Sequence, residues 1–331
     1  MRADLGASVH AGWMRGVLVA LGVLLLATAC GAPAGPDDQR GSAPRSPATV
    51  NTAAPPHSRA GTPTGTPAPN RPARPSPATV PRPDHVVVVV LENHSYGEVL
   101  DSADAPFIAS LAASGATFTR SFAVTHPSQP NYLALFSGST LGISDDSCPH
   151  TFASPNVARA LLDAGDSFVG YSEGLPAPGF TGCSRGAYAR KHNPWVNFAN
   201  VPASVNRPFT TFPDDFTRLP TVSFVIPDLE HDMHDGTMGQ ANQWLDDHLG
   251  RYAAWAPAHR SILVLTFDED DQSANNRILT IVTGAFVRPG RYAERIDHYR
   301  LLRTLTDAYH LHPLGAAAAT PPVTDIWSAN R

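Results

Sequence analysis

Polar residues that could bind a cation follow two apolar segments of this sequence. Glu92 and Asn93 come directly after residues 85–91 (HVVVVVL), and the acidic residues 268–271 (DEDD) come directly after residues 261–267 (SILVLTF). Four consecutive carboxylates repel one another unless a cation lies among them, and hard oxygen ligands favour Ca²⁺, Mg²⁺ or Mn²⁺. If both segments are strands of one parallel sheet, the two polar groups meet at the same edge and predict a divalent-cation site. An acidic surface loop is the alternative.

A candidate nucleophile lies in residues 125–138 (THPSQPNYLALFSG). Ser128 stands two positions before Pro130, and proline favours the first turn of a helix. The free N–H groups and the dipole at a helix N-terminus stabilise both an alkoxide and a bound phosphate oxygen. The position suits a serine that accepts a phosphoryl group, although a serine that only caps the helix would stand in the same place.

A further polar group occupies residues 227–236 (PDLEHDMHDG), with two histidines and three aspartates within eight residues. This density predicts metal ligation or phosphate binding, and the absence of an HExxH pattern excludes a zincin protease. His298 follows Asp297 at the start of the last predicted helix. A histidine there suits a neutral ligand or a base, and a surface position is the alternative.

These residues need a scaffold that brings them together. The β-branched run at 85–91 suits a strand covered on both faces. The remaining pattern predicts strands near 117–123, 167–171, 221–226, 261–267 and 278–283 and helices at 106–114, from about 131, 156–164, 238–255 and 299–311. This alternation predicts an α/β domain with a doubly wound, mostly parallel sheet and helices on both faces. Ligands of such sheets gather beyond the carboxyl ends of the strands.

Composition limits the class of protein. Of the 331 residues, 42% are hydrophobic, which rules out wholesale disorder and allows a sizeable core. Residues 84–331, the expected folded domain, carry 16 Lys and Arg against 26 Asp and Glu. Nucleic acid is excluded as a partner of so acidic a body.

The N-terminal residues are typical of an exported protein. Residues 1–30 read as a signal peptide, because Arg15 precedes the apolar run 17–26 and small residues lead to Cys30. A cysteine in this place is typical of a bacterial lipobox, in which the thiol is acylated and anchors the protein to the membrane. Cleavage after Ala27-Thr28-Ala29 would instead give a free secreted protein.

Residues 31–83 contain 14 of the 32 prolines and no aromatic residue, so they predict a disordered tether between the membrane and the folded domain. Export also bears on the cysteines. Cys148 and Cys183 are the pair that remains once Cys30 is acylated, and an oxidising compartment favours a disulfide between them.

Taken together, these motifs resemble the phosphoesterase family that contains bacterial acid phosphatases and phospholipases C, within the alkaline phosphatase superfamily. The resemblance rests on Glu92-Asn93 and on residues 125–138, 232–236 and 268–271. Further similar segments are 188–192, 194–198, 222–227 and 324–327. As a whole, the resemblance covers nearly all of residues 84–331. It implies an alkaline-phosphatase-like fold and metal-dependent hydrolysis of phosphate monoesters through a serine.

The resemblance also implies a set of site residues. The expected ligands of the metal are Glu92, Asn93, Ser128, Asp268 and Glu269. Ser128 is the expected nucleophile and His234 the expected general acid or phosphate clamp. The further candidates for substrate binding are His231, Asp232, Asp235, His298, Arg190 and Lys191. A basic patch that could bind a second phosphate of the substrate or be a solvated loop consists of Arg185, Arg190, Lys191 and His192.

The expected substrates are phosphorylated small molecules or lipid head groups outside the cytoplasm, including phosphoinositides, and no protein partner is implied. Two alternatives stay open. A phosphodiesterase of the phospholipase C type would use the same nucleophile and metal, although such enzymes usually have extra C-terminal sequence. A nonenzymatic lipoprotein that binds phosphate or cations would need no nucleophile. Two-metal enzymes of the superfamily usually have Asp-His where this chain has Asp268-Glu269, so the number of metals is left open.

Overall fold

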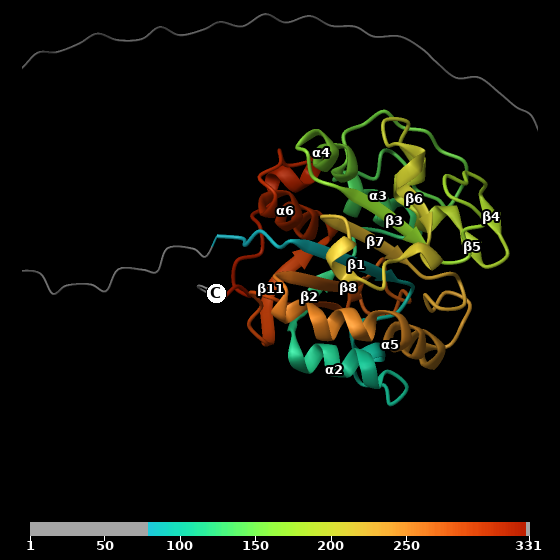
Figure 1. Cartoon of the computed structure of the whole chain (residues 1–331). Helices are drawn as coiled ribbons and strands as arrows, with labels where there is room; N and C mark the ends of the chain where they lie inside the picture. Colours follow the sequence, from blue (N-terminus) through green and yellow to red (C-terminus); the bar gives the residue numbers. More distant parts are fainter. Residues whose placement is uncertain (1–78, 329–331) are drawn as a thin grey trace, which may run out of the picture. The chain divides into compact units, whose positions relative to one another are not determined.

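A computed structural model of the chain describes residues 79–328 (Figure 1). The predicted signal peptide, Cys30 and the tether as far as residue 78 lie outside the described residues. Residues 84–328 of the expected phosphoesterase domain fall within one compact unit. No helix within the described range has the length and apolar character to cross a membrane.

A mostly parallel sheet forms the centre of residues 79–328, and its strands follow the order β11-β2-β10-β8-β1-β7-β3-β6, with β9 paired to β2. The strands are β1 (His85–Leu91), β2 (Ala116–Phe122), β3 (Phe168–Ser172), β6 (Asn206–Pro208), β7 (Val222–Ile226), β8 (Ser261–Phe267), β9 (Arg277–Ile278), β10 (Thr280–Gly284) and β11 (Gly290–Asp297). Strands β9 and β10 run antiparallel to their neighbours. A separate hairpin consists of β4 (Ser184–Arg185) and β5 (Tyr188–Ala189).

Strand β1 lies between β7 and β8, and both of its faces are buried. Its side chains alternate between two hydrophobic clusters: Val86, Val88 and Val90 pack in one, and Val87 and Val89 pack in the other. The unbroken valine run is therefore explained by helices on both faces of the sheet, as a buried parallel strand requires.

The helices are α1 (Tyr96–Leu100), α2 (Pro106–Ser114), α3 (Ser128–Ser137), α4 (Val157–Asp163), α5 (Met238–Trp255) and α6 (His298–Ala308). Helices α2 and α5 cover one face, and α3, α4 and α6 cover the other (Figure 1). The predicted α/β class with helices on both faces is confirmed. Four expected elements, at 85–91, 106–114, 238–255 and 261–267, have the predicted bounds.

Two features of the sheet differ from the prediction. Strand β11 was not predicted, because its sequence GRYAERID is polar and it lies at the edge of the sheet, where half of its residues are exposed. The single strand expected at 278–283 is divided at Leu279 into β9 and β10.

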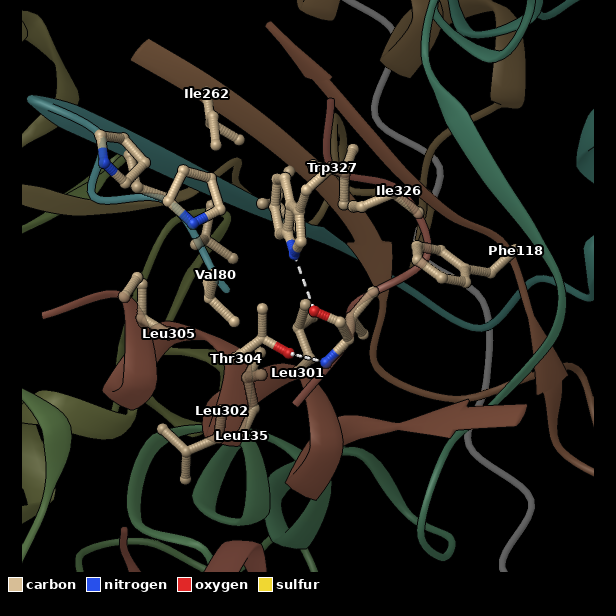
Figure 2. A pocket seen from close by; sticks show the side chains of 18 of the residues that line it. Val80, Phe118, Leu135, Ile262, Leu301, Leu302, Thr304, Leu305, Ile326 and Trp327 are labelled. Carbon is tan, nitrogen blue, oxygen red and sulfur yellow. Dashed lines mark hydrogen bonds between the residues drawn. The ribbon is translucent and has the colours of Figure 1, made fainter. Parts of the chain in front are cut away.

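The C-terminal segment closes the face that α6 covers (Figure 2). Val323, Ile326 and Trp327 line an apolar pocket between α6 and strands β1 and β8. The indole of Trp327 donates to the carbonyl of Val323 at 2.7 Å, and the amide of Val323 donates to Thr304 Oγ1 at 2.8 Å. These bonds hold the segment against α6, so the terminal residues form part of the core.

Candidate active site

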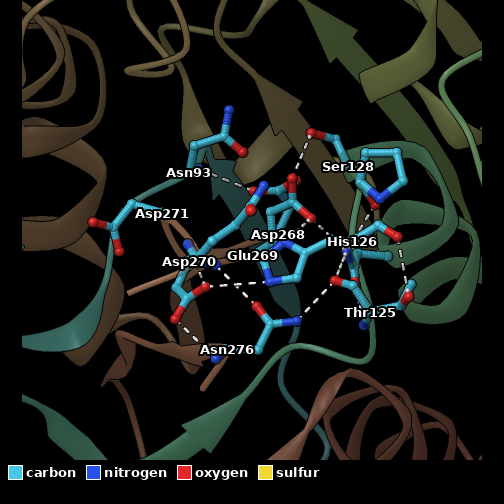
Figure 3. Close-up of polar contacts among 12 residues, drawn as sticks. Asn93, Thr125, His126, Ser128, Asp268, Glu269, Asp270, Asp271 and Asn276 are labelled. Carbon is cyan, nitrogen blue, oxygen red and sulfur yellow. Dashed lines mark hydrogen bonds and ion pairs between the residues drawn. The ribbon is translucent and has the colours of Figure 1, made fainter. Parts of the chain in front are cut away.

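The register of β1 and β8 places the two polar segments side by side. Leu91 lies opposite Phe267 in this parallel pair, so Glu92 and Asp268 emerge together at the carboxyl ends of the strands. Asn93 adopts a left-handed backbone conformation (φ 52°), and its amide donates to Asp268 Oδ1 at 3.2 Å (Figure 3). The juxtaposition expected from the sequence is therefore present.

Ser128 is the first residue of α3 and lies above these carboxylates (Figure 3). Its hydroxyl donates to Glu92 Oε2 at 2.9 Å and lies 3.4 Å from Glu269 Oε1. The side chain of Asn131 fixes the approach to the helix, because its Oδ1 accepts from the amides of Val124 and Thr125. Ser128 thus occupies the helix start predicted from Pro130, and it is buried.

The residues around Ser128 fit a divalent cation. Glu92, Asp268 and Glu269 are all buried. Burial and the neighbouring Asp268 raise the pKa of Glu92 well above its ordinary value, and burial and Glu269 do the same to the pKa of Asp268. Burial and Asp146 raise the pKa of Glu269 to about 7.

Two buried oxygens among the described residues also favour a cation at this place. Asp268 Oδ2 and Asn93 Oδ1 are buried without a hydrogen-bond partner in the described structure. Buried polar atoms are normally paired, and a hard cation would satisfy both oxygens and offset the repulsion among the three carboxylates. The structure therefore contains a group of residues that could bind the expected metal, without indicating which metal.

A buried histidine forms the next part of the site. His192 Nδ1 lies 3.1 Å from Asp232 Oδ2, and its Nε2 lies 3.4 Å from Glu92 Oε1. Burial holds the pKa of His192 well below its usual range and raises the pKa of Asp232 to about 8. Tyr132 stacks on the imidazole ring and donates its hydroxyl to Glu92. An imidazole with Nδ1–H on Asp232 presents the lone pair of Nε2 to the site.

Positive charge lies on the more open side of the site. Lys191 Nζ donates to Asp146 Oδ2 at 2.9 Å and lies 3.2 Å from His234 Nε2. Asp146 Oδ1 accepts from the amide of Gln129, next to the candidate nucleophile. His234 Nδ1 lies 2.7 Å from Asp235 Oδ1. If Nδ1 donates to Asp235, Nε2 accepts from Lys191 and the ammonium supplies the charge at this point.

Two of the predicted substrate ligands, Arg190 and His298, are buried. Arg190 is 5% exposed, and its guanidinium donates to Asn197 and to backbone carbonyls, so it braces loops. His298 is 1% exposed, and its Nε2 lies 2.6 Å from the backbone oxygen of Asp268. Arg190 therefore serves to brace loops, and His298 contacts the backbone of a predicted metal ligand. Contact of either side chain with substrate stays a prediction.

His231 belongs to a separate cluster at the ends of β3 and β7. Its Nδ1 lies 3.0 Å from Glu173 Oε2 and 3.1 Å from Asp228 Oδ1, and Trp244 Nε1 donates to Glu173 Oε1 at 2.8 Å. These contacts hold the loop that carries Asp232 and His234. The structure thus gives His231 a role in positioning that loop, and its contact with substrate stays a prediction.

Several site residues were not singled out from the sequence. His126 Nδ1 lies 2.8 Å from Glu269 Oε2, and Tyr132 and Asp146 make the contacts described above. His192 was predicted only as a member of the basic patch. His126 stands within the motif of Ser128, so proximity to Ser128 was the available signal for it. Asp146 had none, because its place beside Lys191 depends on the fold.

The predicted disulfide between Cys148 and Cys183 is present. It joins the loop that follows Asp146 to the segment that leads into η1 (Arg190–His192), and the carbonyl of Cys183 accepts from the amide of Arg190 at 2.9 Å. The bond therefore braces two loops that supply polar residues to the open side of the site.

The chain is similar in sequence to known phosphatases. The chain is 53% identical over 246 residues to a phosphatidylinositol-3-phosphatase of Mycobacterium tuberculosis, a match that covers 73% of this chain and 82% of that protein. It is 32% identical over 227 residues to a phosphate-repressible acid phosphatase of Penicillium chrysogenum, covering 63% of this chain. This chain spans about half the length of the fungal relative, since the match covers 55% of it.

The fold has a counterpart among solved structures. A protein in the alkaline phosphatase superfamily from Vibrio parahaemolyticus superposes with a TM-score of 0.51 at 13% identity, covering 75% of this chain and 72% of that one. The model of the Phosphoesterase family matches residues 98–312. Fold and relatives together support phosphoester hydrolysis, and the chain belongs to the phosphoesterase family.

Proposed function

We propose that this protein is a phosphatase that hydrolyses phosphate monoesters through Ser128 with a divalent cation, outside the cytoplasm. One observation carries the proposal: the Ser128 hydroxyl lies at the start of α3 and within 3.4 Å of both Glu92 and Glu269. A serine needed only to cap the helix would bond a backbone amide of the first turn, and Ser128 makes no such bond. A nonenzymatic binding protein would not need this hydroxyl at all.

Hydrolysis would proceed in two steps. Ser128 Oγ attacks phosphorus as the bond to the leaving oxygen breaks, and its proton passes to Glu92 Oε2, the nearest acceptor at 2.9 Å. Water then attacks the phosphoserine, phosphate leaves, and the proton returns to Ser128 Oγ. The free amides at the start of α3 stabilise negative charge near the serine.

The expected cation would be held by Glu92, Asn93, Ser128, Asp268 and Glu269. When bound, it would neutralise the carboxylates and polarise the phosphoryl group. Asn131 and His126 position parts of this set, because Asn131 Nδ2 lies 3.4 Å and His126 Nδ1 2.8 Å from Glu269 Oε2.

Phosphate recognition would fall to Lys191, His192 and His234. The ammonium of Lys191 is the cation that faces the nonbridging oxygens, and it lies 3.2 Å from His234 Nε2. His234 would act as the general acid toward the leaving oxygen. Asp232 and Asp235 contact His192 and His234 and keep the two rings in place.

The substrate class follows from the relatives. One relative is named as a phosphatidylinositol-3-phosphatase and another as an acid phosphatase, so phosphorylated inositol lipids and soluble monoesters are the proposed substrates. The N-terminal sequence supports action outside the cytoplasm, either anchored through Cys30 or secreted.

A panel of esters tests the proposal. Purified protein is assayed with p-nitrophenyl phosphate, phosphatidylinositol 3-phosphate, bis-p-nitrophenyl phosphate and phosphatidylcholine, each with and without chelator. Release of phosphate from the monoesters, lost with chelator and restored by Ca²⁺, Mg²⁺ or Mn²⁺, is expected. Release of diacylglycerol from phosphatidylcholine would instead assign the phospholipase C reaction. If none of the esters is hydrolysed, a nonenzymatic protein that binds phosphate or cations is the remaining interpretation.

A further inference from the structure

We propose that the sheet edge formed by β2, β9 and β11 is a docking surface for a membrane rich in anionic phospholipid. The surface consists of Arg120, Arg277, Arg291 and Arg295, here called the edge arginine cluster. The inference rests on the proposed function in one respect, that the substrate includes a lipid head group. It extends that function by identifying how the protein would approach a substrate held in a bilayer.

The first part of the cluster follows from the strand register. Arg120 in β2 lies opposite Arg295 in the parallel strand β11. The guanidinium of Arg295 lies over the ring of Phe122, 4.0 Å from its centroid. Phe122 in turn lies opposite Arg277 in β9. Arg295 therefore contacts the Phe122 ring, and Arg120 and Arg277 occupy neighbouring positions on the paired strands.

Tyr96 connects the fourth arginine. The guanidinium of Arg277 lies over the Tyr96 ring, 4.2 Å from its centroid. Arg291 Nη2 donates to the hydroxyl of the same tyrosine at 2.8 Å. Arg277 and Arg295 therefore make cation–π contacts. Arg291 joins them through the hydroxyl of Tyr96, and Arg120 lies opposite Arg295 in the sheet.

The charge of this group is not neutralised by the protein. Within residues 79–328, no ion pair involves any of the four arginines. Neighbouring carboxylates have other partners: Glu294 pairs with Arg300, and Asp297 accepts from the backbone amide of Arg300. The cluster is a concentration of unpaired positive charge on a domain with ten more acidic than basic residues.

The shape of the cluster favours a surface as its partner. Arg120, Arg291 and Arg295 are exposed side chains on the two strands that form this edge, so they suit an extended anionic surface better than a single small anion. Each arginine close to an anionic leaflet strengthens binding by about fivefold. Four would suffice for a measurable preference over a neutral bilayer.

The position of the cluster relates it to the site. Phe122 ends β2 six residues before Ser128, and β9 begins directly after the loop that carries Asp268 and Glu269. Strands β2 and β11 form this edge of the sheet (Figure 1), and both run parallel, so their carboxyl ends lie on the same side as the site. A membrane on this edge would bring head groups beside the candidate active site.

Vesicle sedimentation tests the inference. The full chain carrying Cys30→Ser, so that acylation cannot attach it, is mixed with vesicles of phosphatidylcholine alone or with 30% phosphatidylglycerol, roughly the charge of an anionic leaflet. Preferential binding to the anionic vesicles, weakened by salt, is expected. Replacing all four cluster arginines by glutamine should lower this binding by about 100-fold or more and leave hydrolysis of p-nitrophenyl phosphate unchanged.

A control variant has glutamine at Arg159, Arg207, Arg218 and Arg251, which lie on other elements, and so has the same net charge. It should bind anionic vesicles like the parent. Equal binding to both kinds of vesicle by the parent, unchanged binding by the cluster variant, or an equal loss in the control would overturn the inference. Vesicle binding by a protein that hydrolyses no ester would refute the proposed function and not the docking surface. A cluster variant that also loses soluble monoester activity is replaced by the Arg120→Gln, Arg295→Gln double variant, which must show a salt-sensitive loss of about 25-fold.

Discussion

At the scale of single residues, Ser128 combines three properties that serve different purposes. It begins α3, its hydroxyl contacts two buried carboxylates, and it is itself buried. Replacing Ser128 by alanine should lower turnover of a phosphate monoester by about 10³-fold or more, because the covalent route is lost. The unfolding midpoint should change little, since Ser128 bonds no backbone amide of the helix.

Thr125 and Ser137 are the matched controls for this measurement. Thr125 precedes the helix and its hydroxyl contacts the carbonyl of His126, while Ser137 ends the helix and donates to Leu133 at 2.9 Å. Alanine at either position should retain most activity. Near-normal turnover in Ser128→Ala, together with an inactive Thr125→Ala, would move the nucleophile by three residues and refute the argument from the helix start.

The pKa of Glu269 makes stability depend on pH in a defined direction. Burial raises this pKa from about 4.5 to about 7, so the folded protein holds a proton that the unfolded chain releases. In chelator-treated protein, the contribution of protonated Glu269 to the free energy of unfolding is fully present below pH 4.5 and is lost as the pH rises to about 7. Thermal unfolding midpoints of the wild type and of Glu269→Gln, measured across this range, should converge at low pH and separate at high pH.

Bound metal should remove much of this difference, since a cation stabilises the ionised carboxylates. Adding Ca²⁺, Mg²⁺ or Mn²⁺ should therefore raise the unfolding midpoint of the wild type most at neutral pH, and less in Glu269→Gln. A midpoint that responds to no metal at any pH would exclude this site.

At the scale of elements, the sequence was most informative where local patterns and burial agree. The valine run of β1 and the apolar run of β8 predicted buried neighbouring strands, and hence the meeting of Glu92 with Asp268. Periodicity also located α2 and α5. The polar edge strand β11 carries no comparable pattern, because one of its sides faces solvent.

The contribution of η1 to the candidate active site could not be predicted, because it depends on packing between segments that are distant in the sequence. His192 and Asp232 are 40 positions apart, as are Glu92 and Tyr132, and neither pair has a periodic signature. The basic patch identified Lys191 but also Arg190, whose guanidinium turns inward to carbonyl groups. Only the path of the chain in the structure shows that Lys191 faces the site whereas Arg190 turns inward.

Gly170 in β3 provides a test of how one element positions another. A Cβ atom at this residue would lie 2.1 Å from the indole of Trp195, which is buried in η2 (Pro194–Asn197), directly after His192. Gly170→Ala should therefore displace Trp195, cost about 1–3 kcal/mol of stability and lower activity by moving His192. Chemical unfolding and monoester turnover measure both effects.

Gly97 in α1 is the control, because its Cβ would meet only Asp101 Oδ2 at 3.8 Å. Gly97→Ala should keep or slightly raise stability, since alanine is favoured over glycine within a helix. If both variants are equally stable, the indole moves at no cost and the packing argument fails.

At the scale of the whole molecule, the N-terminal segments remain predictions. The signal sequence, acylation of Cys30 and the tether at 31–83 follow from composition and motif. Mass spectrometry of exported protein should find a mature chain that begins at an acylated Cys30. An unmodified N-terminus, with the protein free in the medium, would show cleavage without anchoring.

The disulfide links this localisation to the site. It closes a loop of 35 residues between Cys148 and Cys183, and a loop of this size contributes about 3–4 kcal/mol of stability in an oxidising compartment. Arg190 braces the same region, because its guanidinium donates to the carbonyls of Thr181 and His150.

Replacing both cysteines by alanine should therefore lower stability by about 2–4 kcal/mol. It should raise KM more than it lowers kcat, because the loosened loops carry Asp146 and Lys191 whereas Ser128 and the buried carboxylates stand on α3, β1 and β8. Denaturant unfolding and steady-state kinetics with p-nitrophenyl phosphate, in parallel with Ser147→Ala as a nearby control, measure both. A large loss of kcat at unchanged KM would mean that the disulfide positions the nucleophile and not the phosphate-binding side of the site.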